Sequence, residues 1–177
     1  MKDLITRLAS AEAAKQFQFL LIGGSGLGAH KLQRDTRDID FLIASDDFAK
    51  VEEIILALGY ERLPGSSSAF RQYNHPDQAE VPVDLMLVNT STFGKLASDS
   101  VPAEFLGVSL RAPSVASFIA LKLHALRWNP KREVKDMADI SMLLRLNPGV
   151  VSSGRLKELC DRYAPPGYFE KLAPLVS

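Results

Sequence analysis

Apolar and polar residues follow two different rhythms along this chain, and the rhythm changes near residue 113. Before it, short apolar runs alternate with glycine, proline and polar turns, which predicts strands with a few short helices. After it, apolar residues recur at helical spacing, which predicts helices over 114–128, 133–146 and 152–163. We therefore expect an α/β (α+β) fold in two parts. A mixed sheet flanked by helices would fill residues 1–112, and a helical C-terminal segment packed on this core would fill 113–177.

The first part is expected to hold five strands and four helices. The strands are predicted over residues 17–22, 39–44, 70–74, 81–88 and 108–111. The helices are predicted over 2–15, 26–31, a stretch that follows residue 47 and ends at Gly59, and 93–97. The polar cluster 45–47 predicts a side-chain cap for the third helix, and the Pro/Gly/Ser-rich stretch 64–68 predicts a flexible loop.

Composition narrows the class of protein. The chain has 177 residues, equal numbers of basic and acidic residues and one cysteine. Zero net charge gives no global field for DNA or an anionic membrane, although a local basic patch stays open. The lone Cys160 excludes an internal disulfide and fits a reducing cytosol. The N-terminal residues carry acidic groups and lack a signal-peptide apolar stretch, and no run is long enough to span a membrane. We expect a cytoplasmic protein that does not enter a membrane.

Two aspartates open the second predicted strand. Asp38 and Asp40 flank Ile39, and because side chains alternate on a strand, both carboxylates would leave the same face. Asp84 interrupts a later apolar strand and would join them if the two strands are neighbours. Adjacent anions repel, so such a cluster favours a site for a divalent cation such as Mg²⁺. The alternative is that each aspartate merely faces water at a strand end.

A glycine turn precedes these aspartates. Gly23, Gly24 and Ser25 follow an apolar strand and would offer backbone N–H groups and a hydroxyl to phosphate oxygens. Arg34 and Arg37, just before the aspartates, would add phosphate contacts or would be ordinary solvated charges.

A dinucleotide-binding fold is the main rival interpretation of this turn. Residues 24–29 fit the pattern G-x-G-x-x-A after a strand, with an acidic residue at 46 or 47. However, the segment 34–38 is too polar for the helix that this fold requires. The interpretation also leaves the three aspartates unexplained.

The helical part carries three further charged candidates. Lys122 lies on the apolar stripe of its helix, where it would either extend to the edge of the stripe or meet an anion in a cleft. Asp136 and Asp139 lie near the start of the next helix. They would have a functional role, or they would only interact favourably with the helix dipole, with Asp139 paired to Lys135.

These motifs together resemble the DNA polymerase beta-type nucleotidyltransferase superfamily. The resemblance rests on the glycine turn 22–25, the Asp-x-Asp at 38–40 and the strand aspartate at 84. The longer run over 23–43, with KLHAL at 122–126 and KDMAD at 135–139, is similar to the AbiEii-type nucleotidyltransferase toxins and their relatives.

This resemblance implies a fold, a reaction and roles for residues. It implies a magnesium-dependent enzyme that moves a nucleoside monophosphate from a triphosphate to an acceptor hydroxyl on tRNA, a protein or a small molecule. Asp38 and Asp40 would bind the metal and the triphosphate, and Asp84 would complete the site and help deprotonate the acceptor. A further set would hold phosphates or act as acid or base: Gly24, Ser25, Lys122, Asp136 and Asp139. The toxin likeness implies an antitoxin partner. The alternative is a catalytically silent protein of this fold that acts by binding a partner.

Overall fold

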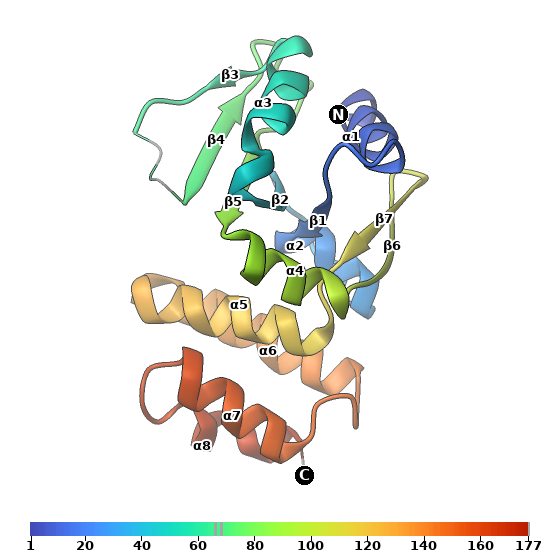
Figure 1. Cartoon of the computed structure of the whole chain (residues 1–177). Helices are drawn as coiled ribbons and strands as arrows, with labels where there is room; N and C mark the ends of the chain where they lie inside the picture. The colour runs from blue at the N-terminus through green and yellow to red at the C-terminus, as the bar shows by residue number, and fades with distance from the viewer. Residues whose placement is uncertain (66, 68, 177) are drawn as a thin grey trace. The chain divides into compact units, whose positions relative to one another are not determined.

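The computed structural model describes residues 1–65, 67 and 69–176 as two units. The first unit comprises residues 1–29 and 33–113, and the second comprises 30–32 and 114–177. The chain therefore passes between the units after residues 29, 32 and 113. Figure 1 follows it from the N-terminus to the C-terminus. Of the loop predicted over 64–68, residues 66 and 68 lie outside the described part.

A five-stranded mixed sheet forms the centre of the first unit. Its strands run in the order β1 (Phe19–Ile22), β2 (Ile39–Ala44), β5 (Val83–Val88), β4 (Phe70–Asn74) and β3 (Glu61–Arg62). Strands β2 and β5 pair in parallel, and the other neighbours pair antiparallel. Strands β6 (Val101–Phe105) and β7 (Val108–Ala112) form a separate antiparallel hairpin.

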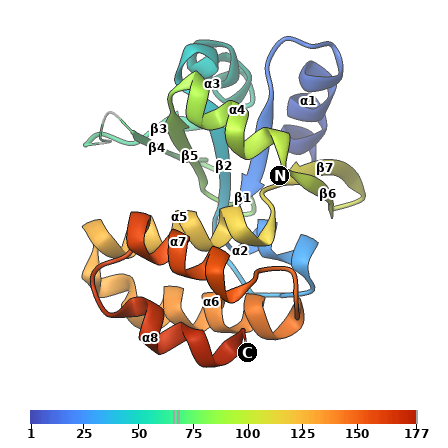
Figure 2. The ribbon, with the colours of Figure 1, turned by 60° about the horizontal axis from the view of Figure 1, so that its bottom comes forward.

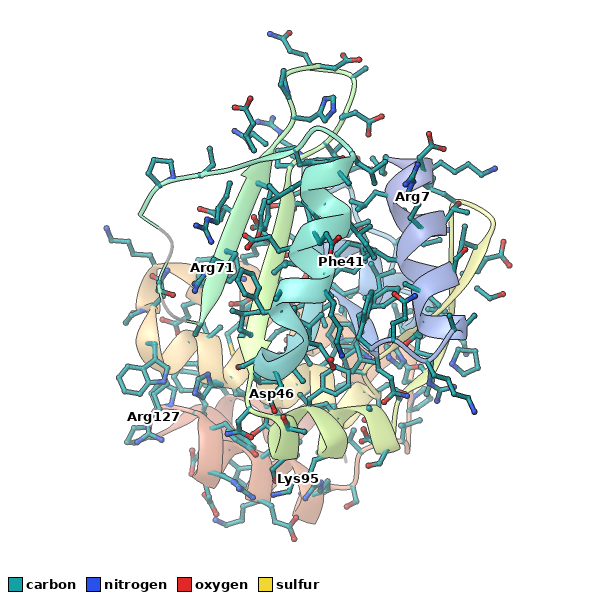
Figure 3. The ribbon with its side chains drawn as sticks, turned by 45° about the horizontal axis from the view of Figure 1, so that its top comes forward. Arg7, Phe41, Asp46, Arg71, Lys95 and Arg127 are labelled. Atoms are coloured by element: carbon teal, nitrogen blue, oxygen red, sulfur yellow. The ribbon has the colours of Figure 1, made fainter. Side chains whose placement is uncertain are left out.

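The central strands are nearly continuous apolar runs because both of their faces are covered. In β2 every residue but Asp40 is buried, and β1 is buried along its whole length. Such runs are typical of strands in the middle of a sheet that has protein on both sides. Phe19 and Phe41 pack edge to face across β1 and β2, with ring centroids 5.4 Å apart. Figure 3 labels Phe41 beneath the helix that crosses the sheet.

Amphipathic helices complete the first unit. Helix α1 (Lys2–Ala13) buries Leu4, Ile5 and Leu8 and contacts both α3 (Phe48–Ala57) and β7. Helix α4 (Thr90–Ser98) follows β5 and contacts β2. The glycine segment forms the short helix α2 (Gly23–Gly26) and the 3₁₀ turn η1 (Leu27–His30).

The second unit is helical. It contains α5 (Val115–Trp128), η3 (Pro130–Arg132), α6 (Glu133–Leu146), α7 (Ser153–Tyr163), α8 (Tyr168–Leu172) and η4 (Ala173–Leu175). Helix α5 packs against both α6 and α7, and Figure 2 shows these helices from below. The segment 30–32 belongs here because the buried His30 ring packs edge to face on Phe118, at 5.5 Å, and Asn147 donates to the His30 carbonyl.

The predicted fold class is confirmed, while several local predictions are wrong. Strands β3 and β6 were not predicted. Strand β3 has only two residues, both exposed, and in β6 the apolar residues are interrupted by Pro102 and Glu104. The cluster 45–47 forms a 3₁₀ turn, and α3 has no side-chain cap. The cap is missing because Asp46 accepts a hydrogen bond from Thr90 and Asp47 pairs with Lys50. None of the helices in the described part combines the length and apolar character needed to cross a membrane.

Candidate functional site

The glycine turn is shaped around one aspartate. Gly23 ends β1 with a φ of +60°, a left-handed conformation that L side chains rarely adopt. A Cβ at this position would overlap the Asp40 carboxylate, and even the Asp40 Cβ would lie only 2.9 Å from it. Because β1 and β2 are antiparallel and Ile22 lies opposite Asp40, the Asp40 side chain packs directly on the turn.

A threonine connects the same turn to Asp38. Thr36 Oγ1 donates to the Asp38 carboxylate at 2.5 Å and also lies 3.0 Å from the Asp38 carbonyl oxygen. The Thr36 side chain also fills the space beside Gly24, where an added Cβ would lie 3.0 Å from the Thr36 Cβ. Any side chain at position 24 would therefore push on the residue that orients Asp38.

The third aspartate lies on the neighbouring strand. Asp84 is the register partner of Asp40 in the parallel β2–β5 ladder, so the two side chains leave the same face of the sheet from adjacent positions. Gln72, opposite Asp84 on β4, donates from Nε2 to both Asp84 oxygens at 3.2 and 3.4 Å. The glutamine thus fixes the Asp84 carboxylate from the side away from Asp40.

Burial changes the acidity of Asp84. Its side chain is 7% exposed, and this desolvation raises the pKa of Asp84 above its usual range. The Gln72 hydrogen bond lowers the pKa, while the negative charge of Asp38 raises it further. A carboxylate with a raised pKa is a better proton acceptor near neutral pH than an ordinary aspartate.

The donor set suits a hard cation without forming a complete cage. Within the described residues, no three His, Cys, Asp or Glu side chains are arranged to hold a metal ion. Magnesium commonly takes one or two carboxylates and completes its shell with substrate phosphates and water, so it does not need a complete protein cage. The buried hydroxyl of Ser25 has no hydrogen-bond partner, so an acceptor or donor from a ligand would satisfy it.

The predicted arginines flank this arrangement. Arg37 is exposed, and Arg34 is half-buried and makes an interaction of its own. Their role as phosphate contacts stays a prediction.

The dinucleotide-binding interpretation of the turn is wrong. That fold needs a parallel βαβ unit after the glycines, whereas β2 returns antiparallel to β1. The acidic residue that would bind a ribose, Asp46, accepts a hydrogen bond from Thr90 instead.

In the second unit, the other candidates form a buried ionic cluster. Lys122 Nζ lies 2.6 Å from Asp139 Oδ2 and 3.2 Å from Asp136 Oδ1, and Arg132 Nε lies 2.8 Å from Asp136 Oδ2. Lys122 is 8% exposed and Asp136 is fully buried. Lys122 therefore does not extend into solvent at the edge of its stripe, and Asp139 pairs with Lys122, a partner that the helix pattern did not predict.

Two residues of the first-unit site were not assigned from the sequence. Thr36 lies within the run 23–43 and Gln72 within the predicted strand 70–74, and neither was given a role. The available signal was weak: a hydroxyl two residues before an Asp-x-Asp, and a polar residue within a strand. Only the register that sets Gln72 opposite Asp84 reveals its role.

Comparison with known proteins agrees with this geometry. The model of a family described as "Uncharacterised nucleotidyltransferase" matches residues 3–164. The structure of the antibiotic-resistance factor ANT(2'')-Ia has a TM-score of 0.65 at 14% identity, with 98% of this chain and 93% of that one covered. The lincosamide antibiotic adenylyltransferase LnuA, solved with lincomycin, has a TM-score of 0.58 at 14% identity, with 83% and 98% covered.

A fungal protein also shares the fold. An antigenic nucleotidyltransferase-like protein from Paracoccidioides brasiliensis has a TM-score of 0.59 at 14% identity, with 99% of this chain and 92% of that one covered. No protein of curated function matches the chain significantly in sequence. At these identities the solved structures establish the fold, and the family match establishes the family.

Proposed function

This chain belongs to the family of uncharacterised nucleotidyltransferases, and on that premise we propose that it transfers a nucleoside monophosphate from a triphosphate to an acceptor hydroxyl. The observation that supports the proposal is Asp40 packed on the Gly23 turn beside its register partner Asp84, with the charge of Asp38 acting on Asp84. Each carboxylate has a dedicated neighbour: Thr36 for Asp38, the turn itself for Asp40, and Gln72 for Asp84.

The reaction needs positioning and charge neutralisation rather than covalent catalysis. The acceptor oxygen forms a bond to the α-phosphorus while the bond to the bridging oxygen of the pyrophosphate breaks. Asp84 accepts the acceptor's proton, a role for which its burial and raised pKa are suited. The glycine turn and the Ser25 hydroxyl hold phosphate oxygens, since glycine lets the triphosphate approach the backbone closely.

Magnesium is the cofactor that this donor set would hold. Asp38 and Asp40 would be its protein ligands, with Asp84 as the third candidate. When bound, the ion would neutralise charge on the triphosphate and on the leaving pyrophosphate.

We propose that the ionic cluster of Lys122, Asp136 and Asp139 supports the fold of the second unit. In the second unit the lysine charge is matched by two aspartates, and Arg132 shares one of them. To contact a phosphate directly, Lys122 would have to break its ion pair with an aspartate and bind the substrate instead. This contact therefore stays a prediction from the resemblance. The same holds for an acid or base role of Asp136 or Asp139.

Calorimetric titration of each nucleoside triphosphate, with and without Mg²⁺, tests the proposal. We expect metal-dependent binding of at least one triphosphate, and we expect Asp38→Ala to weaken it by more than the roughly 10–100-fold that loss of an outer-shell partner costs. Asp35→Ala is the matched control, because Asp35 is an exposed aspartate of the same segment. Equal binding by Asp38→Ala and Asp35→Ala would refute the site. Absence of any triphosphate binding would favour the silent, partner-binding alternative.

A toxin role rests on the resemblance alone. If the chain is a toxin, its expression should arrest growth, and Asp38→Ala should abolish the arrest at equal protein level. An antitoxin partner would then co-purify with the chain, and its co-expression would relieve the growth arrest. Growth that is unaffected by the active enzyme would exclude the toxin role and leave the transfer reaction in place.

A further inference from the structure

The corner where α5 passes through η3 into α6 exposes an unusual pair of apolar side chains. Trp128, the only tryptophan of the chain, ends α5 and is 75% exposed. Val134, in the first turn of α6, is 86% exposed. A tryptophan normally buries most of its large surface, so one left open to solvent indicates a surface that another molecule covers.

The indole makes one hydrogen bond within the protein. Trp128 Nε1 donates to Nε2 of His124, one turn earlier on α5, at 3.2 Å. The two rings are inclined at 57° with centroids 6.3 Å apart, so the imidazole does not lie flat on the indole. The polar edge of the tryptophan is therefore satisfied within the protein, while a flat aromatic face stays available for a ligand.

Basic residues lie close to Trp128 in the sequence. Arg127, Lys131, Arg132 and Lys135 lie within the nine residues 127–135, and the nearby Glu133 is paired with Lys171 at 2.8 Å. In the part of the chain that the structure describes, Lys131 and Lys135 make no ion pair. Figure 3 labels Arg127 at the outer edge of the helices. The corner is therefore a local positive patch on a chain whose net charge is zero.

We propose that this corner, defined by Trp128, Arg127, Lys131 and Lys135, binds single-stranded nucleic acid, with a base stacked on Trp128 and phosphates contacted by the basic side chains. A flat aromatic face near exposed cations is the arrangement that recognises unstacked bases and their backbone. Lysine and arginine reach phosphates at successive positions, and every base offers a π-face to the indole.

An acidic protein surface is the main competing occupant, and the structure favours it less. A protein interface would surround a central tryptophan with further apolar side chains. In the segment 127–135, Val134 is the only other exposed large apolar residue. Double-stranded nucleic acid is also less suitable, because its base faces are covered by stacking. A single strand or a free end fits both the isolated ring and the small size of the basic patch.

Because Trp128 is the only tryptophan, its fluorescence reports binding at this corner directly. We expect single-stranded RNA of roughly 10 nucleotides, within the usual size of such sites, to quench the emission of the wild-type protein saturably. A DNA strand of the same sequence distinguishes a general single-strand site from one that reads the 2′-hydroxyl. A duplex of that sequence and an acidic peptide are the two competitor arms, and saturable quenching by the acidic peptide alone would overturn the proposal.

Variants separate the aromatic and the ionic contributions. Measured by anisotropy of a labelled strand, Trp128→Ala should weaken binding about 5- to 150-fold, and Trp128→Phe should recover part of that loss. Lys131→Ala and Lys135→Ala should each lower the slope of log affinity against log salt by about 0.7. Arg7→Ala is the matched control, because Arg7 is an exposed cation on α1, labelled in Figure 3. Equal effects of all three charge removals, or no effect of Trp128→Ala, would refute the proposal.

The proposal that this corner binds the acceptor of the enzyme rests on the proposed nucleotidyl transfer. The two proposals fail separately. If triphosphate binding depends on Asp38 but no strand quenches Trp128, the transfer reaction stands and its acceptor is not a nucleic acid bound here. If strands bind at Trp128 and no triphosphate binds, the surface stands and the transfer reaction fails.

Discussion

Replacing Gly23 with alanine is the most direct test of how the first-unit site is built. Gly23 has a positive φ, and its missing side chain leaves the space that the Asp40 carboxylate occupies. Gly23→Ala therefore imposes two separate penalties, one on the backbone and one on Asp40. Gly28→Ala is the matched control in the same glycine-rich run, because no described heavy atom lies within 4 Å of a Cβ added there.

The size of the effect follows from these two penalties. A left-handed conformation costs an L residue roughly 1–2 kcal/mol. Moving the Asp40 side chain off its present rotamer, away from the new methyl group, costs a further ~0.5–1.5 kcal/mol. We expect Gly23→Ala to lower the free energy of unfolding of the first unit by about 1.5–3.5 kcal/mol. That is less than the ~5–15 kcal/mol of a typical domain, so the variant should still fold.

The assay has to observe the first unit specifically. Circular dichroism reports the unfolding of both units in urea, so metal-dependent triphosphate binding, measured on the same samples, reports the first-unit site. Gly23→Ala should lose stability and lose binding, whereas Gly28→Ala should keep binding and gain up to about 1 kcal/mol from reduced chain entropy. If Gly23→Ala binds the triphosphate like the wild type, the close packing of Asp40 on the turn is irrelevant to the site.

Four further predictions concern single side chains. Lys122→Ala leaves buried Asp139 without this cation and leaves Asp136 to its pair with Arg132, so we expect a loss of ~3–5 kcal/mol in urea unfolding followed by circular dichroism, and a loss below 1 kcal/mol would contradict the ionic cluster. Gln72→Leu should reduce turnover by roughly 10–100-fold without unfolding the chain, because Asp84 loses its orienting donor. Burial raises the pKa of Cys160 to about 11, so alkylation of the folded protein at pH 8 should proceed with a thiolate fraction of about one thousandth and accelerate on unfolding. Desolvation raises the pKa of Glu12, so the folded state prefers the protonated form. Glu12→Gln should therefore be the more stable protein at pH 7, and this advantage should shrink as the pH falls through 4.5, which comparative thermal unfolding would reveal.

The strands that build the site were predictable because their residues favour a strand and are too few for a helix. The run 39–44 is apolar, β-rich and too short for a helix, and it forms β2 with the predicted bounds. Strand β6 was not predictable from its own residues. Val101 to Phe105 contains a proline and an exposed glutamate and forms a strand only because β7 pairs with it through a turn at Leu106 and Gly107, both with positive φ.

The three aspartates and the glycine turn were predictable as candidates, whereas their supporting residues were not. Alternation along a strand predicts Asp38 and Asp40 on one face, whereas β2 begins at Ile39, so Asp38 lies just before the strand. Gln72 and Asp84 are twelve residues apart in sequence, and their contact depends on the register between β4 and β5, which no local pattern specifies. A contact of that kind has to be observed.

Lys122 and Trp128 show why the same helix pattern leads to opposite outcomes. Both residues lie on α5, and helical spacing placed Lys122 on the apolar stripe, either at its edge or facing an anion. In the structure Lys122 is 8% exposed and Trp128 is 75% exposed. The lysine is tolerated inside because α6 supplies two aspartates. Trp128 stays largely exposed, and its indole N–H donates to His124. The burial of Lys122 is thus explained within the protein, whereas the exposure of Trp128 is the observation behind the proposed single-strand site.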